Sequence, residues 1–136
     1  MRYLLDTNIF LFMLMDREQI HRDVAVILND YENLLYISTI SVQEIIHLYQ
    51  THKIKNVWKL ADNIIPTILE AGLILLPVKK EHLTTYANLS LVLNHKDPND
   101  RVIISQTITE KLTLVSSDKK FLEYTNQNLQ FVLNKR

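Results

Sequence analysis

The chain begins with the stretch Arg2-Tyr3-Leu4-Leu5-Asp6-Thr7-Asn8, in which a short apolar run ends on an acid, and the apolar run Ile9 to Met15 follows. An apolar run of this length is typical of a buried strand, and an acid at its end has little packing reason to be there. Further along, short apolar runs alternate with longer segments of helical period, which is typical of βαβ units and a parallel sheet. We therefore expect an α/β fold with Asp6 at the end of its first strand.

Five apolar runs predict the strands of this sheet. They are Arg2 to Leu5, Leu34 to Ser38, Leu73 to Val78, Thr113 to Ser116 and Gln130 to Leu133, and each of the first four leads towards a helix. The chain shows no internal repeat and no linker rich in Gly, Ser or Pro. Its length of 136 residues suits one domain that buries roughly two-thirds of the surface of the unfolded chain, so we expect a single domain over residues 1–136.

The first clear helix signal follows the second strand. Apolar or aromatic residues recur at i, i+3, i+4 and i+7 behind Ser41, which is the predicted cap, and they are Val42, Ile45, Ile46 and Tyr49. This spacing places one apolar stripe on the helix.

Three further helices are predicted. The first runs from about Asn56 to Ala71, ends at Gly72, the only glycine, and bends at Pro66. The second runs from about Glu81 to Leu93 and precedes a turn at Asn94 to Lys96. The third has Asp97 as its cap and Pro98 in its first turn, and continues from Asp100 to Glu110.

The composition excludes several kinds of site. Cysteine is absent, so disulfides, thiolate metal ligands and a cysteine nucleophile are excluded. Fifteen basic and fifteen acidic residues cancel, so no strong overall positive field holds nucleic acid. The longest apolar run, Ile9 to Met15, is far shorter than the roughly 20 residues that span a bilayer. Because no cleavage site follows the N-terminal apolar stretch, we expect a soluble, cytoplasmic protein without a membrane segment.

Four acids stand at the ends of predicted elements. Asp6 closes the first strand, Glu44 lies in the first helical turn after the second, Asp100 opens the helix before the fourth, and Asp118 follows the fourth. Because the carboxyl ends of parallel strands meet in one crevice, we expect Asp6, Glu44 and Asp118 to share an edge of the sheet. Asp100 joins them if its helix begins at that edge.

Such a cluster of carboxylates needs a cation. Two unit charges about 5 Å apart repel by about 3 kcal/mol at an effective dielectric of roughly 20, whereas a helix N-terminus stabilises a nearby anion by only about 0.3–1 kcal/mol. A divalent ion offsets the repulsion, and oxygen ligands without cysteine favour Mg²⁺ or Mn²⁺ over zinc. One or two such ions activate a water for in-line attack on a phosphodiester, so no side-chain nucleophile is required.

Each acid also has a purely structural interpretation. Ser41-Val42-Gln43-Glu44 fits a capping box in which Glu44 returns to the Ser41 amide, and Asp97-Pro98-Asn99-Asp100 caps a helix equally well. Asp118 suits a turn ahead of a short helix that contains Phe121, Leu122 and Tyr124. Taken singly, each acid is better explained as a cap, and it is the joint placement of the four that favours a metal site.

Four motifs follow one another in the chain. They are Leu4-Leu5-Asp6-Thr7-Asn8, Ser41-Val42-Gln43-Glu44, His95-Lys96-Asp97-Pro98-Asn99-Asp100-Arg101 followed by Val102-Ile103-Ile104-Ser105-Gln106, and Leu114-Val115-Ser116-Ser117-Asp118. Each is weak alone, but in this order they resemble PIN-domain nucleases. In particular, the chain resembles toxins of the virulence-associated protein C (VapC) type from bacterial and archaeal toxin–antitoxin pairs, and the resemblance covers nearly the whole chain.

For the site, this resemblance implies a pocket for Mg²⁺ or Mn²⁺ formed by Asp6, Glu44, Asp100 and Asp118. It implies polar support beside the pocket from Thr7, Asn8 and Ser116. Asp97 matches an acid often seen in the third motif, and we interpret it as a capping or supporting residue rather than a ligand. Asn99 stands where relatives often have phenylalanine, which bears on local packing and not on the metal site.

For the whole protein, the resemblance implies a twisted parallel sheet with helices on both faces. It also implies an endoribonuclease that cleaves RNA such as tRNA, rRNA or mRNA. The implied partners are a small antitoxin, whose tail lies over the active-site groove, and a second copy of the chain in a homodimer.

The remaining residues carry less weight. No histidine has metal-ligand spacing with a matching acid, apart from His95 near Asp97, and we assign none a catalytic role. The run Ile9 to Met15 suits core packing or an antitoxin-binding groove. Candidate phosphate contacts are Arg17, Arg22, Lys53, Lys55, Lys59, Lys96, Arg101, Lys119 and Lys120, although a solvated helix face explains Lys53, Lys55 and Lys59 more simply.

Two other functions stay open. A Mg²⁺-dependent phosphatase or phosphotransferase would use Asp6 as its nucleophile, but that chemistry usually pairs the nucleophile with an acid two residues on, where this chain has Asn8. A catalytically silent RNA- or antitoxin-binding module would keep the shape alone, but all four acids are present. The nuclease is the favoured function.

Overall fold

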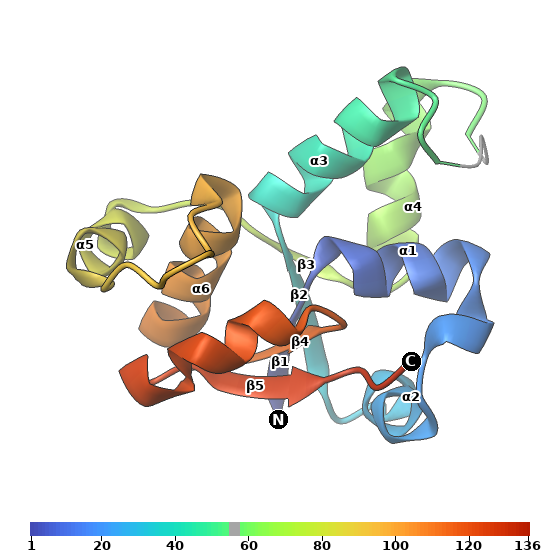
Figure 1. The fold of residues 1–136 in the computed structure, drawn as a ribbon. Coiled ribbons are helices and arrows are strands. Elements are labelled where there is room, and N and C mark those ends of the chain that lie inside the picture. The colour runs from blue at the N-terminus through green and yellow to red at the C-terminus, as the bar shows by residue number, and fades with distance from the viewer. Residues whose placement is uncertain (55–57) are drawn as a thin grey trace.

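A parallel sheet forms the centre of the molecule (Figure 1). The computed structural model describes residues 1–54 and 58–136, and these residues form five strands in the order β3-β2-β1-β4-β5, with every neighbouring pair parallel. The strands are β1 (Arg2–Leu5), β2 (Leu34–Ser38), β3 (Ile74–Leu76), β4 (Thr113–Ser116) and β5 (Gln130–Leu133). The predicted parallel sheet is confirmed, and β3 is shorter than the predicted run Leu73 to Val78.

The strand order reverses between β1 and β4. From β1 the chain moves outward through β2 to β3, and then crosses to the other side of β1 to place β4 and β5. Leu5 pairs with Ile37 of β2 and with Val115 of β4, so these three strands end almost level with one another. Open α/β sheets bind ligands beyond the carboxyl ends of their strands at such a reversal. The residues that follow β1 and β4 are therefore placed where a site is expected.

Helices cover both faces of the sheet, as predicted (Figure 1). One face carries α1 (Thr7–Met15), α2 (Arg22–Asn29), α3 (Thr39–Gln50) and α4 (Ile64–Glu70), and the other carries α5 (Lys80–Asn88), α6 (Pro98–Glu110) and the 3₁₀ helix Lys119–Gln127. Leu5 and Val115 pack with the first group, whereas Leu4 and Leu114 pack with the second. The central strands β1, β2 and β4 are largely buried and therefore nearly continuously apolar, and this made them recognisable in the sequence.

Helix α3 begins earlier than predicted. Its N-cap is Ser38, whose hydroxyl accepts a hydrogen bond from the Ile40 backbone N–H at 3.0 Å. Ser41, the predicted cap, is buried inside the first turn, and its hydroxyl has no hydrogen-bond partner among the described residues. The capping box of Ser41 with Glu44 is therefore wrong, and Glu44 lies in the second turn of α3 rather than the first.

The helix predicted from Asn56 to Ala71 is much shorter in the structure. Asn56 lies outside the described residues, and α4 begins only at Ile64, after a 3₁₀ turn over Ala61–Asn63. Pro66 is the third residue of α4, where a missing N–H removes no intrahelical bond, so the predicted bend inside a long helix is wrong. Gly72 follows the helix with φ of 85°, the left-handed conformation predicted for it.

Helix α5 ends at Asn88, five residues before the predicted end at Leu93. The Arg101 guanidinium donates to the carbonyls of Leu89 at 2.8 Å and Ser90 at 3.1 Å, and so holds the chain in an extended path after α5. The start of α6 is as predicted, because Asp97 caps it by accepting from the Asn99 backbone N–H at 2.9 Å and Pro98 is its first residue.

The run Ile9 to Met15 forms most of α1. Ile9 and Phe10 are fully buried in the core, which confirms the packing interpretation for these two residues, whereas Leu14 is exposed. Among the residues that the structure describes, no helix combines the length and the apolar character of a membrane span.

Candidate active site

Asp6 lies at the reversal of strand order, directly after β1. Its backbone N–H donates to the Val115 carbonyl at 2.9 Å, and the residue is only 7% exposed. Oδ1 accepts from the Thr7 backbone N–H at 2.9 Å, so Asp6 is the N-cap of α1. Oδ2 accepts from the Ser116 hydroxyl at 2.6 Å and from the Asn8 amide at 3.3 Å. These contacts fix the carboxylate against β4 and confirm that Thr7, Asn8 and Ser116 stand beside it.

The electrostatic surroundings of Asp6 are unfavourable for a carboxylate. The pKa of Asp6 is raised to about 6, mainly by burial. The charges of Asp100 and Glu44 contribute to this rise, whereas the hydrogen bonds from Ser116 and Thr7 oppose it. The charged neighbours that act on Asp6 are thus themselves acids. No positive charge of a described residue is among the causes that act on Asp6, so a nearby cation would favour its charged form.

Asp100 is the third residue of α6, and its side chain is 26% exposed. Oδ2 lies 3.1 Å from Nε2 of His95. Burial raises the pKa of Asp100, and the charges of Asp97 and Asp118 add to this, whereas the hydrogen bond and charge of His95 lower it. The start of α6 therefore brings Asp100 near enough to Asp6 and Asp118 for their charges to interact.

The Ser116 hydroxyl group forms hydrogen bonds with both Asp118 and Asp6. The Asp118 backbone N–H donates to Oγ of Ser116 at 3.0 Å, and that Oγ in turn donates to Asp6. Oδ1 of Asp118 accepts from the Lys120 backbone N–H at 2.9 Å and so caps the 3₁₀ helix, as the local interpretation predicted. Nearby, the Ser117 backbone N–H donates to the Asn8 side-chain carbonyl at 3.4 Å.

Glu44 approaches the pocket from α3. Its side chain is exposed and accepts no hydrogen bond from a described residue, so it is not held as a cap. Its charge still raises the pKa of Asp6. Glu44 is therefore near enough to interact with the buried carboxylate.

The four predicted acids are thus near enough to influence one another: the charges of Asp100 and Glu44 raise the pKa of Asp6, and those of Asp97 and Asp118 raise the pKa of Asp100. Among the described residues, no three acid or histidine side chains already converge closely enough to hold a metal ion. The ligand roles of Asp6, Glu44, Asp100 and Asp118 stay a prediction.

Two residues were misjudged from the sequence. His95 was given no role, yet it is 4% exposed and contacts Asp100 directly. Arg101 was a candidate phosphate contact, and this is wrong, because its buried guanidinium is bonded to the carbonyls of Leu89 and Ser90. The spacing of His95 five residues before Asp100, across the Asp97 cap, was the only local signal for the first contact.

Basic side chains line two hollows beside Asp118. A hollow of about 530 Å³ is lined by Val92, Leu93, Asn94, His95, Lys119, Lys120 and Glu123. A second of about 440 Å³ is lined by Ser117, Lys119, Leu133, Asn134, Lys135 and Arg136. Lys119 belongs to both, so the positive charge near the acids lies on the side of β4 and β5. Lys55, another candidate phosphate contact, lies outside the described residues.

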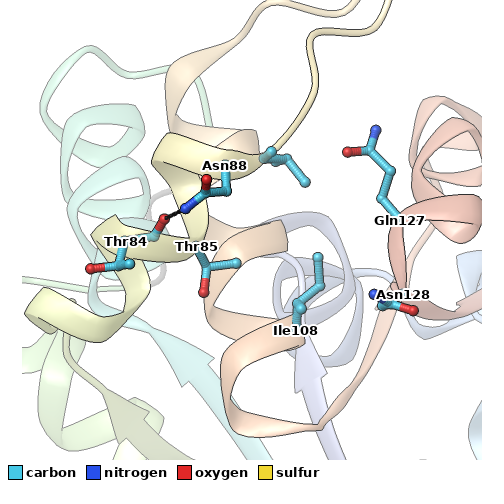
Figure 2. A pocket seen from close by; sticks show the side chains of 7 residues that line it. Thr84, Thr85, Asn88, Ile108, Gln127 and Asn128 are labelled. Atoms are coloured by element: carbon cyan, nitrogen blue, oxygen red, sulfur yellow. Dashed lines mark hydrogen bonds between the residues drawn. The ribbon is translucent and has the colours of Figure 1, made fainter.

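A third hollow, of about 430 Å³, is remote from the acids (Figure 2). It lies between α5, the end of α6 and the end of the 3₁₀ helix, and it is lined by Thr84, Thr85, Asn88, Leu89, Ile108, Gln127 and Asn128. Ile108 comes eight residues after Asp100, which is about 12 Å along the helix axis. Since its lining holds no ionisable side chain, this hollow has no means of acid–base or metal chemistry.

Comparison with known proteins places this geometry in a family. The family model described as the PIN domain matches residues 3–126. No curated protein sequence matches the chain.

Several solved structures share the fold. VapBC2 from Rickettsia felis, bound to a DNA fragment from its promoter, superposes with a TM-score of 0.71 at 20% identity and covers 99% of this chain and 100% of its own. VapBC-1 from nontypeable Haemophilus influenzae gives 0.68 at 20% identity, with 100% of both chains covered. A toxin–antitoxin complex from Klebsiella pneumoniae gives 0.68 at 16% identity, with 98% of both chains covered.

Proposed function

This chain belongs to the PIN domain family, and we propose that it is a metal-dependent endoribonuclease. The observation that carries the proposal is the buried carboxylate of Asp6 at the reversal of strand order. Its raised pKa and its acidic neighbours Asp100 and Glu44 leave a deficit of positive charge that a divalent cation fills.

The donors present fit Mg²⁺ or Mn²⁺. They are carboxylate oxygens on a chain without cysteine, and both ions prefer such ligands. When bound, the ion supplies the acidity that activates a water and neutralises the charge of a phosphodiester under attack. We assign the binding of the ion to Asp6, Glu44, Asp100 and Asp118.

The other residues of the crevice hold these acids in place. The Ser116 hydroxyl and the Asn8 amide both donate to Oδ2 of Asp6, and Ser116 also accepts from the Asp118 backbone N–H. The phosphatase is disfavoured because its aspartyl-phosphate chemistry usually needs an acid two residues after the nucleophile, where this chain has Asn8.

We further propose that the substrate is RNA and that the chain is the toxin of a type II toxin–antitoxin pair. The basic hollows beside Asp118 suit the phosphates of a strand that passes the acids. The partner is then a small antitoxin, because the VapBC and toxin–antitoxin structures match this chain over nearly its whole length. We also propose that the chain forms a homodimer and acts in the cytoplasm. Light scattering of the purified protein tests the dimer.

The domain itself extends, in this proposal, over residues 1–136. The family model ends at residue 126, but β5 follows it and pairs with β4 from Thr113↔Gln130 to Ser116↔Leu133. The sheet is thus completed by residues beyond the matched range.

The test is cleavage of a pool of tRNA and rRNA by the purified protein with Mg²⁺, with Mn²⁺ or with EDTA. We expect cleavage that requires the metal, is lost in Asp6→Asn and Asp100→Asn, and persists in Asp97→Asn. The last variant is the matched control, because asparagine caps a helix as well as aspartate does and Asp97 is exposed. Cleavage that survives Asp6→Asn or EDTA contradicts the proposal, and binding of RNA without cleavage by a protein free of antitoxin favours the silent binding module.

A further inference from the structure

His95 is a buried imidazole with both ring nitrogens engaged. Nε2 lies 3.1 Å from Oδ2 of Asp100, and Nδ1 lies 2.8 Å from the hydroxyl of Tyr124. The rings of Phe121 and Tyr124 pack edge-on against it, with centroids 5.9 and 5.3 Å away. The packing leaves the imidazole little freedom to turn away from Asp100.

The direction of these hydrogen bonds follows from the groups at the two ends, Arg101 and Asp100. Nη1 of Arg101 lies 3.4 Å from the Tyr124 hydroxyl, and a guanidinium can only donate, so the phenol oxygen accepts there. At the other end, an ionised Asp100 carboxylate can only accept, so Nε2 of His95 donates to it and Nδ1 of the neutral ring is an acceptor. The Tyr124 hydroxyl proton therefore has two acceptors, Nδ1 at 2.8 Å and the His95 carbonyl at 3.3 Å, of which Nδ1 is the closer. With Nδ1 as an acceptor, the neutral imidazole carries its proton on Nε2 and donates to Asp100.

We propose that His95 is a positioning residue for Asp100, at the end of a chain of hydrogen bonds that runs from Arg101 through Tyr124 and His95 to the carboxylate. Donors in such a chain polarise one another, so the buried guanidinium strengthens the last bond without touching Asp100. The inference rests on the proposed function in one respect, namely that Asp100 binds the metal ion.

The consequence for the site is geometric. Oδ2 of Asp100 is held by His95, whereas Oδ1 accepts no hydrogen bond from a described residue and stays available to the ion. Groups that orient a metal ligand typically change the metal affinity by about 10- to 100-fold when they are removed. We expect an effect of that size for His95.

The chain contains its own control in His82. This residue is fully buried, its Nδ1 accepts from the Lys79 backbone N–H at 2.9 Å, and its Nε2 lies 2.7 Å from Oε2 of Glu110. It is the same pairing of a buried imidazole with a carboxylate of α6. Glu110 lies ten residues beyond Asp100, about 15 Å along the helix, and none of the proposed metal ligands is beside it.

The experiment is a calorimetric titration of Mn²⁺ into the wild type and variants, with thermal unfolding in EDTA measured in parallel. We expect His95→Ala to weaken Mn²⁺ binding about 10- to 100-fold, and His95→Gln, which keeps a donor near the position of Nε2, to recover part of it. Tyr124→Phe removes one hydroxyl with little change of volume and should weaken binding less. His82→Ala should lower the unfolding temperature but leave Mn²⁺ affinity within about twofold of the wild type.

A second readout needs no metal. Long-range ¹H–¹⁵N spectra report which ring nitrogen carries the proton, and His95 should show the same Nε2–H tautomer as His82. A His95 proton on Nδ1, or equal losses of Mn²⁺ affinity in His95→Ala and His82→Ala, overturns the inference. So does unchanged affinity in both His95→Ala and Tyr124→Phe.

Failure of the proposed function gives a different pattern. If the wild type binds no Mn²⁺, or if Asp6→Asn binds it as tightly as the wild type, then the metal site itself is wrong and the inference falls with it. If Asp6→Asn loses binding while the His95 variants keep it, only the inference is overturned.

Discussion

The Ser116 hydroxyl donates to Oδ2 of Asp6 at 2.6 Å, and so joins the ends of the two strands between which the sheet order reverses. The same oxygen accepts from the Asp118 backbone N–H at 3.0 Å. One buried hydroxyl therefore sets the positions of two acids. It also stabilises the charged form of the more buried one, because its hydrogen bond lowers the pKa of Asp6 against the effect of burial.

Ser116→Ala should accordingly destabilise the protein at neutral pH. The loss of a hydrogen bond to a charged, buried group costs about 1.5–3 kcal/mol, and urea unfolding measures it. Ser41→Ala is the matched control, since Ser41 is equally buried but its hydroxyl has no partner among the described residues. Equal losses in the two variants would contradict the role given to Ser116.

Asp6 should make the metal-free protein less stable as the pH rises. Its pKa is about 6 in the folded state against 3.8 for an unperturbed aspartate, so its stabilising contribution is complete below about pH 4 and is lost as the pH rises through 6. The difference corresponds to about 3 kcal/mol. In EDTA, Asp6→Asn should therefore unfold at a higher temperature than the wild type at pH 7, with the gap closing towards pH 4. A gap that does not vary with pH would contradict the raised pKa.

Divalent metal should offset most of that loss of stability in the wild type. At a Mn²⁺ concentration of about 100 times the dissociation constant, a site present only in the folded state adds about 2.7 kcal/mol. We expect Mn²⁺ to raise the unfolding temperature of the wild type and of Asp97→Asn at pH 7, and to leave that of Asp6→Asn unchanged. An equal rise in all three proteins would indicate that Mn²⁺ binds elsewhere.

The lysines of the two hollows beside Asp118 should contribute to RNA affinity through charge. Each phosphate contact adds about 0.7 to the slope of log affinity against log salt for a single strand, so Lys119→Gln and Lys135→Gln should each lower that slope by about this amount. Fluorescence anisotropy with RNA in EDTA measures it without cleavage. Lys111→Gln, at the far end of α6, should leave the slope unchanged, and a change there equal to that of Lys119→Gln would contradict a local RNA path.

The parts of the fold that follow from local chemistry were predictable from the sequence. The central strands are largely buried and so appear as apolar runs. Pro98 after Asp97 marks the start of α6 without ambiguity. Two serines could cap α3, and the predicted cap, Ser41, is wrong because Ser38 is the N-cap. Helix α2 was given no bounds, because its cap is His21, whose ring nitrogen replaces the usual hydroxyl or carboxylate.

The contacts of His95 and Arg101 could not be predicted from the sequence, because they join residues that are distant in the chain. His95 meets Tyr124 from 29 positions away, and Arg101 is buried by carbonyls on the segment that follows α5. Neither contact leaves a periodic or motif signal in the chain. Asp6 and Asp118 could be predicted to lie together because they follow strand ends, a position that the topology brings together in any open parallel sheet.

The central claim is that the acids at the reversal of strand order form one metal centre, and anomalous diffraction from crystals grown with Mn²⁺ tests it most directly. The account predicts an anomalous peak in the crevice whose nearest protein atoms are carboxylate oxygens of Asp6 and Asp100, at ordinary Mn²⁺–oxygen distances. A crystal of the folded protein with saturating Mn²⁺ and no peak in that crevice, or with its peak at other residues alone, would contradict the account.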